Sequence, residues 1–156
     1  MKRMITVLFV VLTVSALFCA CKNKGEEKRL ANVYSSIREQ VHLSDMNDFQ
    51  DVASLERYYG ITAEEVVDFA GGINYSGVDQ EEIVMVQASN EQAAEHIQTT
   101  LDNRRQSKYN ENKNYHPDQV GMINRSRVDR NGMYISLFIS DNADQIREIY
   151  NTLLEF

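Results

Sequence analysis

The amino-acid sequence predicts an α+β fold: a four-stranded antiparallel sheet with helices packed on one face, preceded by N-terminal helices. Three observations predict it. From residue 71 onward, the pattern strand, strand, helix occurs twice. The second strand pair surrounds Asn131-Gly132, a dipeptide favoured in two-residue hairpin turns. Before residue 60, apolar residues recur at three- and four-residue intervals, which is typical of amphipathic helices.

The region ahead of the sheet is predicted to be helical. Leu30 to Val41 carries an apolar stripe over three turns, and a second helix is expected from Asn47 or Asp48 to Tyr58. Thr62 to Glu65 has the pattern of a capping box, in which an N-cap Thr and a Glu three residues later satisfy each other's backbone amides. We therefore expect a third helix to start at Thr62.

The sheet-forming region can be followed from one turn signal to the next. Asn90 is predicted to cap a long helix, and the only proline, Pro117, suits the first turn of a short one. The expected order is strands 71–76 and 82–87, a helix from 90 to about 109, a polar loop 110–116, a short helix from 117 to 122 or 123, strands 125–130 and 133–140, and a closing helix capped by Asp141 or Asn142.

The N-terminus has the plan of an export signal. Lys2 and Arg3 precede an apolar run over residues 5–18, which is shorter than the roughly 20 residues that a membrane-spanning helix needs. Leu17-Phe18-Cys19-Ala20-Cys21 resembles the bacterial lipobox, with Phe18 where Leu is usual. We therefore expect a lipid on Cys21. The alternatives are an ordinary secretory signal cleaved after Ala20 and a cytosolic protein with an apolar N-terminus.

These signals predict three segments: a signal peptide over residues 1–20, a lipidated cysteine and tether over 21–28, and one α+β domain over 29–156. Without Lys2 and Arg3, 14 of the 16 basic residues remain against 23 acidic ones, which disfavours nucleic acid as a partner. Both cysteines lie in or at the signal, so disulfides are not expected, and this leans toward a Gram-positive type of envelope. The expected location is the outer face of the cell membrane, reached through the lipid at Cys21.

Enzyme signatures are weak in this sequence. His42, His96 and His116 have no metal-ligand spacing, and no serine lies in a Gly-x-Ser-x-Gly context. The acid pairs, such as Glu81-Glu82, are adjacent residues that point apart, whereas glycosidase carboxylates face each other. We expect no metal or other cofactor and a non-catalytic role in binding an envelope protein or a small ligand. A hydrolase-type envelope enzyme and a structural assembly subunit are the alternatives.

Arg104 is the most informative polar residue, because it shares the apolar face of the long predicted helix with Ile97 and Leu101, and Lys108 follows one turn on. Cations seldom lie there without partners. Arg104 either snorkels or braces the loop from Tyr115 to Gln119, through carbonyls or Asp118, or it forms an anion or carboxylate site. The candidate binding residues are Arg104, Tyr115 and Gln119. Further tyrosines could line a groove beside them: Tyr58, Tyr59, Tyr75 and Tyr109.

Several short motifs, in order, resemble those of a known family of small exported lipoproteins, domain of unknown function 4358. Leu55 to Ile61 resembles its Leu-x-x-x-Tyr-Gly-Ile opening, and Glu82-Ile83 its Glu-Ile strand. Arg104 followed by Tyr115 to Gln119 resembles its Arg and Tyr-x-Pro-x-Gln pair, although Asn112 stands near the place of an aromatic residue. Gly132 to Tyr134 and Asp141 complete the series. The resemblance, over residues 55–156, implies the lipoprotein address and the fold but no reaction.

Overall fold

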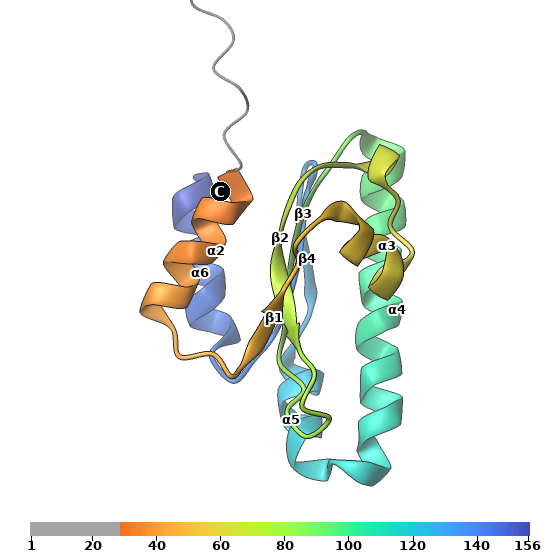
Figure 1. The fold of residues 1–156 in the computed structure, drawn as a ribbon, viewed down its shortest axis with the longest axis vertical. Helices are drawn as coiled ribbons and strands as arrows, with labels where there is room; N and C mark the ends of the chain where they lie inside the picture. The colour runs from red at the N-terminus through yellow and green to blue at the C-terminus, as the bar shows by residue number, and fades with distance from the viewer. Residues whose placement is uncertain (1–28) are drawn as a thin grey trace, which may run out of the picture.

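The computed structural model describes residues 29–156, whose centre is a five-stranded antiparallel sheet in the order β1-β2-β3-β5-β4 (Figure 1). Every neighbouring pair of strands is antiparallel. The α+β class and the antiparallel sheet are confirmed, but the predicted number of four strands is wrong. The strands are β1 (Met46–Asp48), β2 (Val66–Asn74), β3 (Glu82–Ala88), β4 (Val128–Asn131) and β5 (Tyr134–Ile139).

Helices cover both faces of the sheet, so the predicted one-sided arrangement is wrong. Helices α2 and α6 lie on one side, and α3 and α4 lie on the other (Figure 1). Short helix α5 contributes to the core on the α4 side. The helical elements are α2 (Arg29–Gln40), α3 (Val52–Tyr59), the 3-10 turn η1 (Ala63–Glu65), α4 (Glu91–Tyr115), α5 (Pro117–Arg125) and α6 (Ala143–Leu154).

The central strand β3 explains why two layers of helices are needed. Successive side chains of a strand point to opposite faces. Val84 and Val86 belong to the core under α4, whereas Ile83 and Met85 belong to the core under α2 and α6. All four are fully buried. A strand that is apolar on both faces must be covered on both. The continuous apolar run over residues 83–86 is visible in the sequence.

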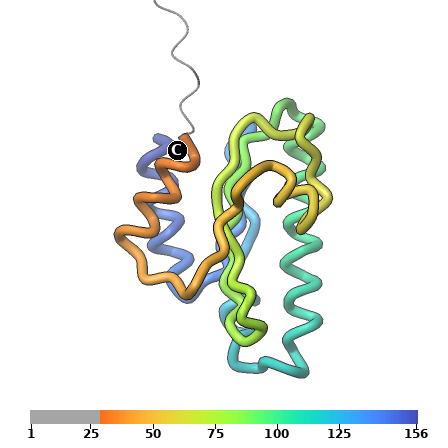
Figure 2. Tube along the Cα trace, viewed as in Figure 1, coloured from red at the N-terminus to blue at the C-terminus, as the bar shows by residue number. Residues whose placement is uncertain are grey.

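Strand β1 was missed because it is only three residues long and carries no alternating pattern. It pairs with β2 at the edge of the sheet, with Asp48 opposite Gly72. The chain passes through β1 from the α2 side to the α3 side (Figure 2). Helix α3 consequently begins later than predicted: Asp51 is its N-cap and accepts a hydrogen bond of 3.0 Å from the amide of Ser54.

The capping box at Thr62 is present, but the predicted helix is not. The Glu65 carboxylate accepts from the amide of Thr62 at 2.9 Å and from its hydroxyl at 3.0 Å. Only the 3-10 turn η1 follows, and Val66 then starts strand β2. The β-branched pair Val66-Val67 favours a strand, and pairing with β3 continues it. A capping box therefore stabilised one turn without propagating a helix.

Helix α4 continues through the stretch predicted to be a polar loop and ends at Tyr115. No proline or glycine interrupts residues 110–115, and the last helical residue, Tyr115, lies two residues before Pro117. His116 between them leaves the helical conformation, as residues before proline commonly do. The predicted β4–β5 hairpin is confirmed: Asn131 pairs with Tyr134, and Gly132 has a φ of 58°. Asn142 is the N-cap residue of α6, although its side chain makes no capping bond.

The signal segment, Cys21 and the tether lie outside the described residues. Among residues 29–156, no helix combines the length and the apolar composition needed to cross a bilayer.

Candidate functional site

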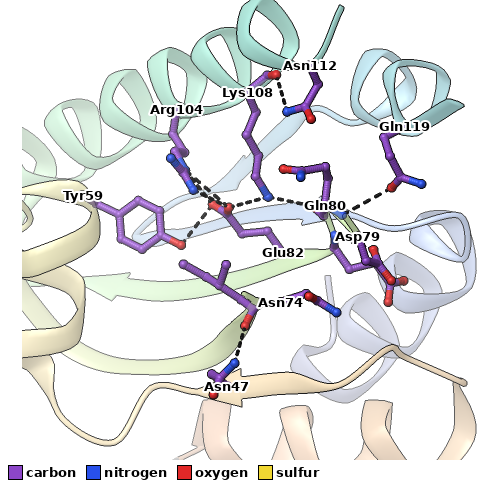
Figure 3. A network of polar contacts seen from close by, with 12 residues as sticks. Asn47, Tyr59, Asn74, Asp79, Gln80, Glu82, Arg104, Lys108, Asn112 and Gln119 are labelled. Atoms are coloured by element: carbon purple, nitrogen blue, oxygen red, sulfur yellow. Dashed lines mark hydrogen bonds and ion pairs between the residues drawn. The ribbon is translucent and has the colours of Figure 1, made fainter. Parts of the chain in front are cut away.

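A buried carboxylate forms the centre of a polar cluster that joins β3 to α3 and α4 (Figure 3). Glu82, the first residue of β3, is completely inaccessible and faces α4. Arg104 binds both of its oxygens, with Nε 3.3 Å from each and Nη2 3.1 Å from Oε2. Lys108, one turn further along α4, places Nζ 2.9 Å from Oε2. Tyr59, at the end of α3, donates its hydroxyl to Oε1 at 3.0 Å.

The charges in this cluster keep Glu82 ionised. Burial alone would raise the pKa of Glu82, but the charges of Lys108 and Arg104 outweigh burial and hold the pKa below its usual value. Burial lowers the pKa of Lys108, and the charge of Glu82 opposes that shift. Burial, with the charge of Glu82 adding to it, raises the pKa of Tyr59 well above its usual value. Tyr59 therefore stays a donor, and two cations surround one carboxylate.

Gln119, one of the predicted binding residues, joins this cluster through the backbone of Gln80 (Figure 3). Lys108 Nζ donates to the carbonyl oxygen of Gln80 at 2.6 Å, and the amide of Gln80 donates to Gln119 Oε1 at 3.3 Å. Buried Asn112 donates to the carbonyl of Lys108 at 2.9 Å. Contacts from α4 and α5 thus hold the loop that leads into β3.

The other expectations for this region are met only in part. Arg104 pairs with Glu82, so the prediction that it braces residues 115–119 through their carbonyls or Asp118 is wrong. Tyr115 is 80% exposed and makes no contact with the cluster. The structure therefore brings Arg104 and Gln119 to one network and leaves Tyr115 outside it.

Part of the predicted tyrosine set does gather beside Arg104. Tyr58, Tyr59 and Tyr75 form one aromatic cluster with Phe49, with ring centroids 5.5–6.4 Å apart. Tyr75 is 49% exposed. Burial and Tyr58 are the main causes that raise the pKa of Tyr75, and the charge of Glu82 adds to them while Arg104 opposes. The aromatic cluster and the buried ions are thus close enough to interact electrostatically.

Sequence reasoning placed Arg104 and Lys108 on an apolar face but did not find Glu82 as their partner. The available signal was a charged residue at the start of an otherwise apolar strand. The prediction that Glu81 and Glu82 point apart is confirmed. Glu81 accepts from the amide and hydroxyl of Ser44, at 2.7 and 2.6 Å, and from the hydroxyl of Ser140.

Metal ligation has no counterpart in the described part of the chain: residues 29–156 contain no group of three or more His, Cys, Asp or Glu side chains arranged to hold an ion. His96 instead contacts Glu65 at the surface, with Nδ1 2.5 Å from Oε1. The site therefore offers cations, tyrosines and amides around the ionised carboxylate of Glu82, whose charge Arg104 and Lys108 balance.

The chain belongs to the family named Domain of unknown function (DUF4358), whose model matches residues 39–140. No curated protein and no solved structure matches the chain. The matched range extends further toward the N-terminus than the resemblance quoted above and contains all five strands. Three residues from separate motifs of that resemblance, Tyr59, Glu82 and Arg104, meet in the buried cluster.

Proposed function

We propose that this protein is exported, anchored by a lipid on Cys21 to the outer face of the cell membrane, and that its domain binds an envelope protein or a small ligand without catalysis. The lipobox-like sequence before Cys21 supports the anchor. Two acyl chains hold a protein stably at a membrane, where one chain gives only reversible attachment. The lipoprotein signal that the resemblance of the short motifs implies also supports the anchor.

The anchor is tested by Cys21→Ala in the full chain. We expect the variant to leave the membrane fraction, because the thioether and its acyl chains are lost while the folded domain is untouched. Immunoblotting of fractionated cells measures this, and Ser44→Ala serves as a control that retains Cys21. A Cys21→Ala variant that still sediments with membranes would contradict lipid anchoring.

The binding role rests on one observation: Arg104 uses Nε and Nη2 for Glu82 and keeps Nη1 without a hydrogen-bond partner among residues 29–156. Its side chain is 30% exposed beside the Tyr58, Tyr59 and Tyr75 cluster. A guanidinium with a free edge recognises carboxylates, and tyrosines supply rigid contact area at binding surfaces. We therefore infer that this face takes a partner that presents a carboxylate near an apolar group.

The ionisation and burial of Glu82 support a role without catalysis. A general acid or base needs a pKa near the working pH and a proton path to substrate. Glu82 has a lowered pKa, is fully buried, and already accepts hydrogen bonds from three side chains. An envelope hydrolase would instead need ionisable groups that converge on open space.

Photo-crosslinking in the native bacterium tests the binding face. A photoreactive benzoylphenylalanine at Tyr75 should form a discrete adduct, and intact-mass measurement registers a protein or a small ligand equally. The matched control is the same residue at Leu153 on α6, which is 43% exposed against 49% for Tyr75. Adding Arg104→Gln should abolish the Tyr75 adduct, with circular dichroism confirming that the variant is folded. No adduct at Tyr75, or one that Arg104→Gln leaves unchanged, overturns the proposal.

A further inference from the structure

A cavity of about 270 Å³ lies between the β4–β5 hairpin and α6, separate from the Glu82 cluster. Residues of the two strands and of α6 line it together. Asp129 and Ser136 are paired across β4 and β5, and Arg147 and Tyr150 come from α6. At about 30 Å³ for each water, the space corresponds to about nine waters, which is the size of a small ligand.

Two buried hydroxyls in residues that line the cavity have no hydrogen-bond partner among the described residues, and neither oxygen is itself accessible to a water-sized molecule. They are Oγ of Ser136 and the phenolic oxygen of Tyr150, in residues that are 1% and 3% exposed. The two lie near each other but outside hydrogen-bonding geometry. Burial raises the pKa of Tyr150, so its hydroxyl stays protonated. A ligand in the cavity reaches neither oxygen in this conformation, so the arginines and aromatic rings of the lining define what the cavity binds.

Two arginines at the same cavity are fixed in place with donors to spare. Asp129 Oδ1 accepts from Arg127 Nε at 2.7 Å, and Oδ2 accepts from Arg147 Nε at 2.6 Å. Arg147 also donates through Nη1 to Asp144 at 2.8 Å. Within residues 29–156, Nη2 of Arg147 and both terminal nitrogens of Arg127 have no acceptor. The Arg147 side chain is only 11% exposed, so its orientation is set before any ligand arrives.

The remaining wall is aromatic. Phe156 has its ring centroid 5.4 Å from that of Tyr134 and 5.8 Å from that of Tyr150, and all three line the cavity. Asp129, the acidic side chain in the lining, already accepts from two guanidinium groups. Unsatisfied donors on one side and aromatic rings on the other define the chemistry that would fill the space.

We propose that this cavity binds the oxyanion, a carboxylate or a phosphate, of a small molecule with an apolar or ring portion. Arg147 and Arg127 bind the charge, and Phe156 with Tyr134 packs on the ring. Arginine presents a planar pair of donors that fits both carboxylate and phosphate. This site is independent of the one proposed around Arg104.

NMR titrations of the full chain in detergent test the proposal with benzoate, phenyl phosphate and neutral benzamide. We expect saturable binding of benzoate or phenyl phosphate, and whichever binds tighter identifies the oxyanion. Benzamide, which lacks the charge, should bind at least about tenfold more weakly, because hydrogen bonds to charged groups are the stronger class. If neither oxyanion saturates at millimolar concentration, or if benzamide binds as tightly as both, the proposal is wrong.

Variants locate the binding. Arg147→Gln should weaken binding of the oxyanion at least about tenfold, whereas Tyr150→Phe, which keeps the ring 5.4 Å from that of Phe138, should leave the affinity unchanged because the hydroxyl does not open into the cavity. The matched control is Arg125→Gln, which removes an exposed ion pair of 2.8 Å with Asp141 outside the cavity. Arg104→Gln should also leave the affinity unchanged, which separates this test from that of the proposed function. Equal losses in Arg147→Gln and Arg125→Gln would overturn the assignment.

Discussion

The two faces of the sheet handle charge in opposite ways. Under α4, Glu82 and Lys108 are removed from water and the pair is completed by Arg104 and Tyr59. On the α2 and α6 side, the core cluster is apolar and aromatic. The buried Glu81 carboxylate there accepts from the hydroxyls of Ser44 and Ser140 and pairs with no cation among residues 29–156, and the ion pairs of Asp129 stay at the rim, where that carboxylate is 32% exposed. One face therefore depends on a charge network that must be complete, and the other depends on burial of apolar surface.

The difference matters because buried charges behave asymmetrically. Moving ions out of water costs several kcal/mol for each ion, and their mutual attraction offsets this only when the geometry is good. Removing one partner leaves the others buried and unpaired. Pairs at the rim keep their hydration and contribute about 0–1 kcal/mol. The α4 face should therefore be far more sensitive to the loss of a single charged group than the α6 face.

The largest effect is expected for Glu82→Ala. It leaves Arg104 and Lys108 facing each other without a counter-charge, and we expect the free energy of unfolding to fall by about 3–5 kcal/mol. Urea unfolding followed by circular dichroism measures this. Asp129→Ala is the matched variant on the other face and should cost about 1 kcal/mol, since Arg127 is largely exposed and Arg147 keeps its bond to Asp144. Equal losses in the two variants would remove the distinction between the faces.

Lowering the pH tests the same comparison, because it protonates Glu82. The folded pKa of Glu82 lies below the ordinary value of 4.5, so its contribution to stability is present above that value and disappears as the pH falls through the lower, folded pKa. The stability difference between wild type and Glu82→Gln should therefore shrink between about pH 7 and about pH 3. Other carboxylates with lowered pKa, such as Asp129, are common to both proteins and cancel. A pH-independent difference would contradict ionised Glu82 as the stabilising form.

Which parts of this fold the sequence predicts depends on whether the signal is local. The hairpin at Asn131-Gly132 and the helix beginning at Pro117 were predicted correctly because turn and cap chemistry act over a few residues. The helix predicted after Thr62 was wrong because its capping box competes with strand pairing between Val66 and Ala88. Strand β1 has no local signal at all and exists through its pairing with β2.

The site shows the same limit. Helical spacing alone placed Arg104 and Lys108 together on one face of α4, and that face is where they lie. Their partner Glu82 lies 22 residues from Arg104 in sequence, and only the packing of α4 across β3 brings the two together. Tyr115 was grouped with Arg104 from motif order, yet the continuation of α4 carries it to an exposed end. Predicting which residues of different elements become partners requires knowing how those elements pack, and the spacing along one helix does not give this.

The smallest expected effect gives the closest comparison, because it removes one hydroxyl from each face. Tyr59→Phe deletes a donor to the Glu82 carboxylate, and we expect a loss of about 1–2 kcal/mol. Tyr150→Phe deletes a buried hydroxyl without a partner in residues 29–156, so the free protein should keep its stability or gain up to about 1 kcal/mol. Urea unfolding of both variants at neutral pH measures the difference. Because each variant loses only one oxygen, side-chain volume contributes little to the comparison. Similar losses would mean that the Tyr150 hydroxyl has a partner within the protein, such as Ser136, and the two buried hydroxyls would then not distinguish the two faces of the sheet.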